Sequence, residues 1–257
     1  MNIPPALLWR WIIFLNPRKV DKIQIMYHWK WSKIIYGILI FVAAWLGAGC
    51  QHLPFADVLF KSTQPTATVA EAILYFDDFS DPNSGWDRTR SEEGFTDYEE
   101  GSYHIFVNES ITDYFATPYR TYSDVRLEVD AIRMAGPVEN TFGLICRFGD
   151  ERNFYLGLIG SDGYYGIFKV QDGEYLQMDN DFMRTSEAIL QDAQAINSLR
   201  FDCHGKQLVL YVNGFLLAAA ENEAYKSGDI GLLAGSFEQP GVLIAFDNFR
   251  ILDPNAP

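Results

Sequence analysis

Alternation of apolar and polar residues is the feature that most constrains the fold of this chain. In residues 125–131, Val125, Leu127, Val129 and Ala131 alternate with charged residues. A period of two predicts a strand with one buried face. The same alternation recurs in 141–149, 199–205 and 207–214. The residues expected to face the core there are Phe142, Leu144, Cys146 and Phe148, then Leu199, Phe201 and Cys203, then Leu208, Leu210 and Val212.

Short turn signals separate these strands. Asp162-Gly163, Asp172-Gly173 and Asn213-Gly214 each lie between apolar runs, and such pairs favour type I′ hairpin turns. Residues 153–178 therefore predict a three-stranded meander, and 199–220 another group of hairpins. Only 186–197 is also compatible with a short helix, the alternative being a strand followed by a loop. About a dozen short strands in 72–253 predict an all-β fold, an antiparallel two-sheet jelly-roll sandwich.

Three segments carry a resemblance to a known superfamily. They are 73–86 (ILYFDDFSDPNSGW), 197–218 (NSLRFDCHGKQLVLYVNGFLLA) and 228–252 (GDIGLLAGSFEQPGVLIAFDNFRIL). Together they resemble the concanavalin A-like lectin/glucanase superfamily, in particular laminin-G-like domains and domains related to 3-keto-disaccharide hydrolases. The resemblance spans nearly all of 72–253. It implies two bent sheets, adjacent first and last strands, and often a carbohydrate on the concave face. It does not imply one activity, because this fold carries many.

The N-terminal region predicts a membrane anchor. Residues 34–49 contain no charge and follow the basic residues Lys30 and Lys33. This order is typical of a signal peptide, and LGAGC, ending at Cys50, resembles the lipobox of bacterial lipoproteins, whose cysteine is lipidated. Counted from Met26, Cys50 is the 25th residue, so translation from Met26 would give a signal of ordinary length. A hydrophobic helix that is not cleaved is the alternative.

Four regions follow from this pattern. Residues 1–33 form a basic leader, 34–50 the hydrophobic signal or anchor, 51–71 a linker, and 72–253 the β-sandwich domain. The linker contains KSTQPTATVA, and Thr, Pro and small residues suit a tether. Basic residues stay on the cytoplasmic side, so we expect a protein of the cell membrane whose domain faces the extracytoplasmic side.

The net charge of the chain after residue 50 restricts which ligands it can bind. Six of the 20 basic residues and one of the 34 acidic residues precede residue 51, so the remainder carries a net charge of −19. A surface so acidic repels phosphate backbones, which argues against nucleic acid as a ligand. The expected partners are the membrane, through a lipid or a single helix, and a glycan.

The best catalytic candidate is the EVDAIR segment, 128–133. Glucanases of the superfamily that the chain resembles have E-x-D-x-x-E, whose outer acids act as nucleophile and general acid/base. Glu128 and Asp130 match, but Arg133 replaces the third acid. Arginine does not donate a proton at neutral pH, so we assign no catalytic residue. The four histidines show no metal-ligand spacing, and we expect His104 and His204, which lie in strand-like segments, to be surface or edge residues and not zinc ligands.

Aromatic and polar residues suggest a ligand surface, since sugar rings stack on exposed aromatic faces. The candidates are Trp86, Arg152, Asn153, Tyr155, Tyr164 and Tyr165. Pairing across Asp162-Gly163 places Tyr155 and Tyr164 on one face and Tyr165 on the other, so one face should be accessible; burial of each ring in the core is the alternative. No cofactor is expected except Ca²⁺, for which Asp78 and Asp247 are candidate ligands if the first and last strands meet. Otherwise these two carboxylates cap turns.

Two cysteines remain once Cys50 is assigned to lipid. The alternation places both Cys146 and Cys203 toward the core. Outside the cytoplasm such a pair forms a disulfide, and two buried free thiols are the alternative.

The combined hypothesis is a membrane-anchored, non-catalytic carbohydrate-binding or adhesion module. One alternative is a glycoside hydrolase acting on a disaccharide or 3-keto sugar, which needs a second acid near Glu128. Another is a protein-interaction domain, which needs a large exposed apolar patch.

Overall fold

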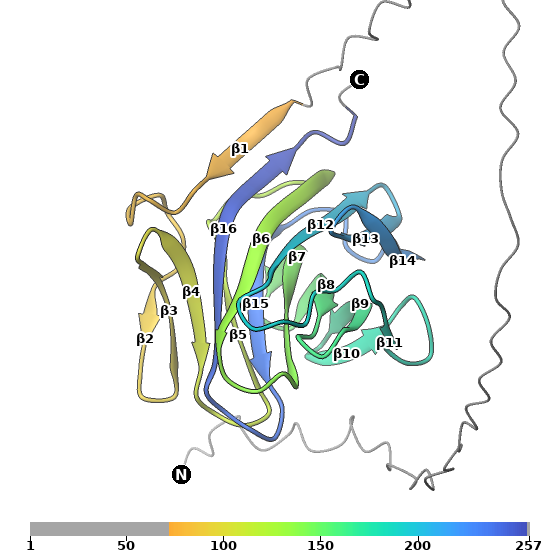
Figure 1. The fold of residues 1–257 in the computed structure, drawn as a ribbon. Coiled ribbons are helices and arrows are strands. Elements are labelled where there is room, and N and C mark those ends of the chain that lie inside the picture. The colour runs from red at the N-terminus through yellow and green to blue at the C-terminus, as the bar shows by residue number, and fades with distance from the viewer. Residues whose placement is uncertain (1–71, 256–257) are drawn as a thin grey trace, which may run out of the picture. The chain divides into compact units, whose positions relative to one another are not determined.

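The computed structural model describes residues 72–255, and in this part the chain folds entirely into strands, turns and loops. Its strands form two antiparallel sheets that pack as a sandwich (Figure 1). The all-β jelly-roll prediction is therefore confirmed. Residues 72–255 include no helix long and apolar enough to cross a bilayer.

Sheet A has nine strands in the order β14-β13-β12-β6-β16-β4-β3-β2, with β1 also paired to β16. Their bounds are β1 Ile73–Asp77, β2 Thr89–Arg90, β3 Gly94–Glu99, β4 Ser102–Val107, β6 Val125–Ala135, β12 Ile196–His204, β13 Gln207–Val212, β14 Phe215–Glu221 and β16 Val242–Leu252.

Sheet B has seven strands in the order β10-β9-β8-β7-β15-β5, with β11 also paired to β9. Their bounds are β5 Thr112–Ala116, β7 Asn140–Asp150, β8 Asn153–Ile159, β9 Tyr164–Gln171, β10 Glu174–Gln177, β11 Arg184–Thr185 and β15 Asp229–Ser236.

The first and last strands of the domain are neighbours, as the family resemblance implied. β1 pairs antiparallel with the C-terminal half of β16, and β4 pairs with its N-terminal half. β6 lies along the other edge of β16. Figure 1 shows these two long, bent strands in the middle of sheet A, with β2–β4 on one side and β12–β14 on the other.

The alternating residues of β6, β12 and β13 fill the space between the sheets. All ten of their predicted inward-facing residues are buried: Val125, Leu127, Val129, Ala131, Leu199, Phe201, Cys203, Leu208, Leu210 and Val212. Because successive side chains of a strand point to opposite faces, the residues between them lie on the outer face of sheet A. That face is where the candidate site forms.

The predicted inward face of β7 is wrong at one residue. Phe142, Leu144 and Cys146 lie in the core between the sheets, but Phe148 packs with Phe115 and Phe154 in a second cluster. The reason is a bulge at Arg147, which has a left-handed φ of 52°, accompanied by a one-residue shift of the β7–β15 register between the pairs Ile145–Gly231 and Phe148–Asp229. One extra residue in a strand moves all later side chains to the other face.

Two of the three turn predictions hold in detail. Asp172-Gly173 and Asn213-Gly214 have positive φ at both residues, as a type I′ turn requires. At Asp162-Gly163 only Gly163 does. Residues 153–177 form the predicted meander β8-β9-β10. Segment 186–195 consists of turns and bends before β12 begins, so the helix alternative is wrong, and the loop precedes the strand instead of following it.

Cys146 of β7 and Cys203 of β12 are joined by a disulfide, with 6.7 Å between their Cα atoms. Each belongs to a different sheet, so the bond links the two layers of the sandwich. The leader, the hydrophobic segment, lipidation at Cys50 and the linker up to residue 71 lie outside the described residues.

Candidate functional site

A shallow hollow of about 320 Å³ lies on the outer face of sheet A. It spans four neighbouring strands, β13, β12, β6 and β16. Its lining residues are Glu128, Val129, Asp130, Ser198, Leu199, Arg200, Tyr211, Gly214, Asn248 and Arg250. Most of them carry hydrogen-bonding groups, so the hollow suits a polar ligand.

Strand pairing determines which side chains meet in the hollow. On β12, Ser198 lies opposite Asp130 and Arg200 lies opposite Glu128. Arg200 is also opposite Tyr211 of β13. Directly opposed residues of antiparallel strands have their side chains on the same face and within reach of each other. Regular alternation in β6 and β12 therefore builds one side of the hollow.

A bulge in β16 builds the other side. Asn248 has a left-handed φ of 55°, and the register with β6 shifts between Asp247 and Arg250. The Asn248 side-chain amide donates to Oδ2 of Asp130 at 3.1 Å. Arg250 then pairs with Glu128, and their side chains are 3.9 Å apart. Bulges re-aim side chains next to functional sites, and this one directs both Asn248 and Arg250 to the hollow.

The cationic side chains of the hollow are fixed by neighbours. The Arg200 guanidinium donates from Nε to Oδ1 of Asp202 at 2.8 Å and lies 4.4 Å from the centre of the Tyr211 ring. The hydrogen bond to Asp202 raises the pKa of Arg200 above its ordinary value, so this group is always charged. Arg126 binds the same carboxylate at 3.2 Å. Donors and acceptors fixed in this way bind hydroxyl groups with little loss of side-chain entropy.

Glu128 and position 133 do not face each other. β6 pairs with β12 without interruption from Val125 to Ile132, so residues five apart point to opposite faces. Arg133 lies opposite the buried Ile244 and donates to the carbonyl oxygen of Gly136 at 3.0 Å. A carboxylate at 133 would therefore also point away from Glu128, so a retaining pair, which needs its two carboxyl groups about 5–5.5 Å apart, does not form from this motif.

A second carboxyl pair lies beside the hollow. Asp247 of β16 is directly opposite Asp130 of β6. Burial raises the pKa of Asp247 above its ordinary value, and the negative charges of Asp130 and Asp78 raise it further. Asp130 itself accepts hydrogen bonds from Ser198 and Asn248. Sequence reasoning did not identify this pair, because their proximity depends on the pairing of strands more than 100 residues apart.

Three of the four predicted ligand-stacking rings, Trp86, Tyr155 and Tyr165, are buried in the core. Trp86 is only 4% exposed, and its indole Nε1 donates to Oδ2 of Asp77 at 3.1 Å. Tyr155 is fully buried, and its hydroxyl donates to Oδ1 of Asn222 at 2.6 Å. None of these ring faces is available to a sugar, so the core alternative applies to all three.

The predicted faces of the β8–β9 hairpin are wrong. Ile159 pairs with Tyr165, and the N–H group of Gly160 donates to Tyr164 O, so the loop contains three residues rather than two. This one-residue difference places Tyr165 with Tyr155 in the core and leaves Tyr164 on the other face, 45% exposed.

Arg152 lies in the turn that connects β7 to β8, and Asn153 is the first residue of β8. Arg152 is exposed and donates to the carbonyl oxygen of Asp172. Asn153 is half-buried, and its side-chain amide donates to Asp150 at 2.9 Å. These contacts hold neighbouring turns of sheet B together, and neither residue lines the hollow of sheet A.

The candidate calcium ligands have other contacts. Asp78 accepts hydrogen bonds from the backbone N–H and the hydroxyl of Ser80, at 3.1 and 2.7 Å, so it caps a turn. Asp247 accepts from the backbone N–H of Asn248 at 2.7 Å. Within residues 72–255, no group of three or more His, Cys, Asp or Glu side chains is arranged to hold a metal ion.

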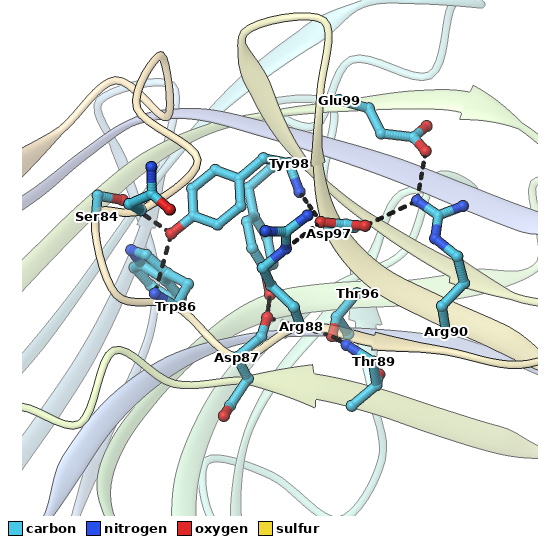
Figure 2. A network of polar contacts seen from close by, with 12 residues as sticks. Ser84, Trp86, Asp87, Arg88, Thr89, Arg90, Thr96, Asp97, Tyr98 and Glu99 are labelled. Atoms are coloured by element: carbon cyan, nitrogen blue, oxygen red, sulfur yellow. Dashed lines mark hydrogen bonds and ion pairs between the residues drawn. The ribbon is translucent and has the colours of Figure 1, made fainter.

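A charged network occupies the β2–β3 edge of sheet A (Figure 2). Asp97 accepts from Arg88 at 2.6 Å and from Arg90 at 2.9 Å, and Arg90 also binds Glu99 at 2.7 Å. Burial alone would raise the pKa of Asp97, but the hydrogen bonds from both arginines hold it below its ordinary value. Because Asp97 lies opposite His104 of β4, this network borders the same outer face as the hollow.

Solved structures share this fold at low sequence identity. The carbohydrate-binding module CBM66 from Bacillus subtilis matches with a TM-score of 0.50 and 18% identity, over 66% of this chain and 96% of that chain. A Bacillus subtilis protein with a galectin-like fold gives 0.55 and 12%, over 70% and 96%. A Bacillus licheniformis β-glucanase gives 0.52 and 15%, over 70% and 98%.

No protein-family model and no curated protein matches the sequence. At these identities the solved structures establish the fold alone. Together with the strand order, they show that residues 72–255 form an antiparallel two-sheet jelly-roll sandwich.

Proposed function

We propose that residues 72–253 are a non-catalytic carbohydrate-binding module that binds a glycan in the hollow on the outer face of sheet A. The observation that carries this proposal is the hollow itself, where fixed charged, amide and hydroxyl groups surround one aromatic ring. Sugar hydroxyls both donate and accept hydrogen bonds, and a mixed lining of this kind satisfies both roles. Structures of the same fold include a carbohydrate-binding module and glycoside hydrolases, which supports a sugar as the ligand class.

A glycan array followed by calorimetry tests this function. We expect the full chain in detergent to bind an oligosaccharide, and Arg250→Ala to weaken that binding about 10- to 100-fold, because a hydrogen bond from a charged donor contributes about 1.5–3 kcal/mol. Arg152→Ala is the matched control, since Arg152 is an exposed arginine of sheet B outside the hollow. Equal losses in both variants, or loss only in Arg152→Ala, would contradict the proposed site.

Glycoside hydrolysis is the second candidate function, and the opposed carboxyl groups of Asp130 and Asp247 favour it. A general acid must be protonated before it reacts, and a raised pKa keeps a carboxyl group protonated to a higher pH. The array ligands should therefore also be analysed for released reducing sugar. Cleavage that disappears in Asp247→Asn would make the domain an enzyme; intact ligand after prolonged incubation supports a binding module.

We also propose that a lipid on Cys50 holds this domain at the extracytoplasmic side of the cell membrane. The support is the order of basic residues, apolar residues and LGAGC in 30–50. In bacterial cells, Cys50→Ser is expected to abolish incorporation of labelled palmitate and to increase the apparent mass, since the signal is no longer removed. Unchanged mass and no labelling of the unsubstituted protein would favour an uncleaved helix instead.

A further inference from the structure

The β3–β4 hairpin brings a serine, a histidine and a glutamate together within six residues. Glu99 ends β3 and Ser102 begins β4, and the two are directly paired. The turn between them, Glu100-Gly101, has positive φ at both residues, which allows a two-residue connection. Tyr103 and Ile105 point into the core, so Ser102 and His104 lie together on the outer face of sheet A, the face that holds the hollow.

The three side chains are arranged in a relay. Ser102 Oγ lies 2.9 Å from Nε2 of His104 and 3.1 Å from the carbonyl oxygen of Glu99, its other hydrogen-bond acceptor, and Nδ1 of His104 lies 3.5 Å from Oε2 of Glu99. The other carboxylate oxygen of Glu99 accepts from Arg90 at 2.7 Å (Figure 2), which orients the carboxylate. This is the order of contacts in which a histidine takes a proton from a serine while a carboxylate orients the ring.

The surroundings of His104 favour its role as a base. Its side chain is only 7% exposed, and burial lowers its pKa below the ordinary value, so the imidazole is neutral at pH 7. Buried Nδ1 forms no hydrogen bond within the described residues, and the Glu99 carboxylate faces it. A proton on Nδ1 would be stabilised by that carboxylate and would leave Nε2 free to accept from Ser102.

We propose that Ser102 is the nucleophile of an esterase activity that removes short acyl groups, such as acetyl, from the glycan bound on this face. The inference rests on the proposed function only for its substrate class, the bound glycan, and departs from it by giving the domain a catalytic role. The neighbours of Ser102 on this face are polar or charged, among them Glu99, Arg90 and Asp97, so they offer no apolar surface to a long acyl chain. An O-acetyl ester on a sugar is small and polar enough for such a site.

The reaction balances with water as the second reactant. Ser102 Oγ attacks the ester carbonyl carbon while His104 Nε2 takes the hydroxyl proton. The carbon–oxygen bond to the sugar then breaks, and the sugar oxygen receives that proton. Water next attacks the acyl-serine, again passing a proton through His104, and releases acetate and free Ser102. The N–H groups of Glu100 and Gly101, in the turn just before Ser102, form no backbone hydrogen bond in the described part of the chain and are the nearest candidate donors in sequence to the oxyanion.

Labelling with a fluorophosphonate probe tests the nucleophile without any glycan. We expect the full chain to be modified at Ser102, identified by peptide mass spectrometry, and to hydrolyse p-nitrophenyl acetate and acetylated xylo-oligosaccharides. Ser102→Ala should abolish labelling and lower hydrolysis at least about 1000-fold, as loss of a serine nucleophile does. Ser110→Ala, which changes an exposed serine that binds the carbonyl of Glu238, should retain both.

Glu99→Gln tests whether the Glu99 carboxylate assists His104 in catalysis or only lies near it. It keeps the size of the side chain but removes the charge facing Nδ1, so kcat should fall by about 10- to 100-fold with KM nearly unchanged. No labelling at Ser102 in the folded chain, or equal hydrolysis by Ser102→Ala, would overturn the proposal. Glycan binding and esterase activity can be lost independently. Ser102→Ala should still bind the array glycan, and Arg250→Ala should still be labelled by the probe. A labelled chain that binds no glycan would overturn the proposed function alone.

Discussion

Replacing Arg147 with methionine should lower the free energy of unfolding by about 3–5 kcal/mol, the cost of breaking a buried ionic contact from one side. Only 2% of the Arg147 side chain is exposed. It donates to the carbonyl oxygens of Ser123 at 2.9 Å, Tyr225 at 3.0 Å and Gly205 at 2.8 Å, and to Asp124 at 3.1 Å. One guanidinium thus holds three connecting segments of the chain against β7.

Methionine has a similar apolar length but no donor, so these acceptors would lose their partner while the packing volume changes little. Equilibrium unfolding in guanidinium chloride measures the difference. Lys226→Met is the matched control, because Lys226 and its ion-pair partner Glu223 are both exposed, and we expect a change within about 1 kcal/mol. A similar small change in Arg147→Met would mean that the three segments are held by other contacts.

Loss of the Cys146–Cys203 disulfide should destabilise the domain by a comparable amount. The bond joins residues 57 apart, and closing a loop of this length in the unfolded chain corresponds to about 4 kcal/mol in the chain-entropy relation. The double variant Cys146→Ala/Cys203→Ala should therefore unfold at a much lower denaturant concentration than the oxidised protein.

Reducing agent gives the matched control for this prediction. It should destabilise the unsubstituted protein strongly and leave the double variant unaffected, because only the former has a bond to reduce. A double variant as stable as the oxidised protein would show that packing between the sheets, and not the covalent link, maintains the contact of β7 with β12. Sensitivity of the double variant to the reductant would place the relevant disulfide elsewhere.

The site shows where sequence reasoning succeeds and where it stops. Alternation in 125–131 correctly predicted that Glu128 and Asp130 lie on the exposed face of a strand. It could not show that Arg200, Tyr211 and Arg250 join them, because that depends on which strands are neighbours in sheet A. The aromatic residues chosen as ligand contacts were instead mostly core residues, since a ring's identity does not reveal which side of a strand is covered.

Single-residue irregularities account for the other differences. The left-handed residues Arg147 and Asn248 produce bulges, and the β8–β9 hairpin has one more loop residue than Asp162-Gly163 suggested. Each shifts the register by one position and so exchanges the two faces of a strand. Arginine does not mark a bulge in a sequence, and asparagine favours a left-handed conformation without specifying where a strand bulges.

The amino-acid sequence by itself determined that residues 72–253 form an antiparallel β-sandwich, because the period of apolar residues and the positions of turn residues are local properties. It also predicted which residues of β6, β12 and β13 face the core. Only the tertiary structure decided which outward-facing residues meet in the hollow, which rings are buried, and that Ser102, His104 and Glu99 face one another. Those outcomes depend on strand order, register and bulges, which arise from the packing of segments far apart in the chain.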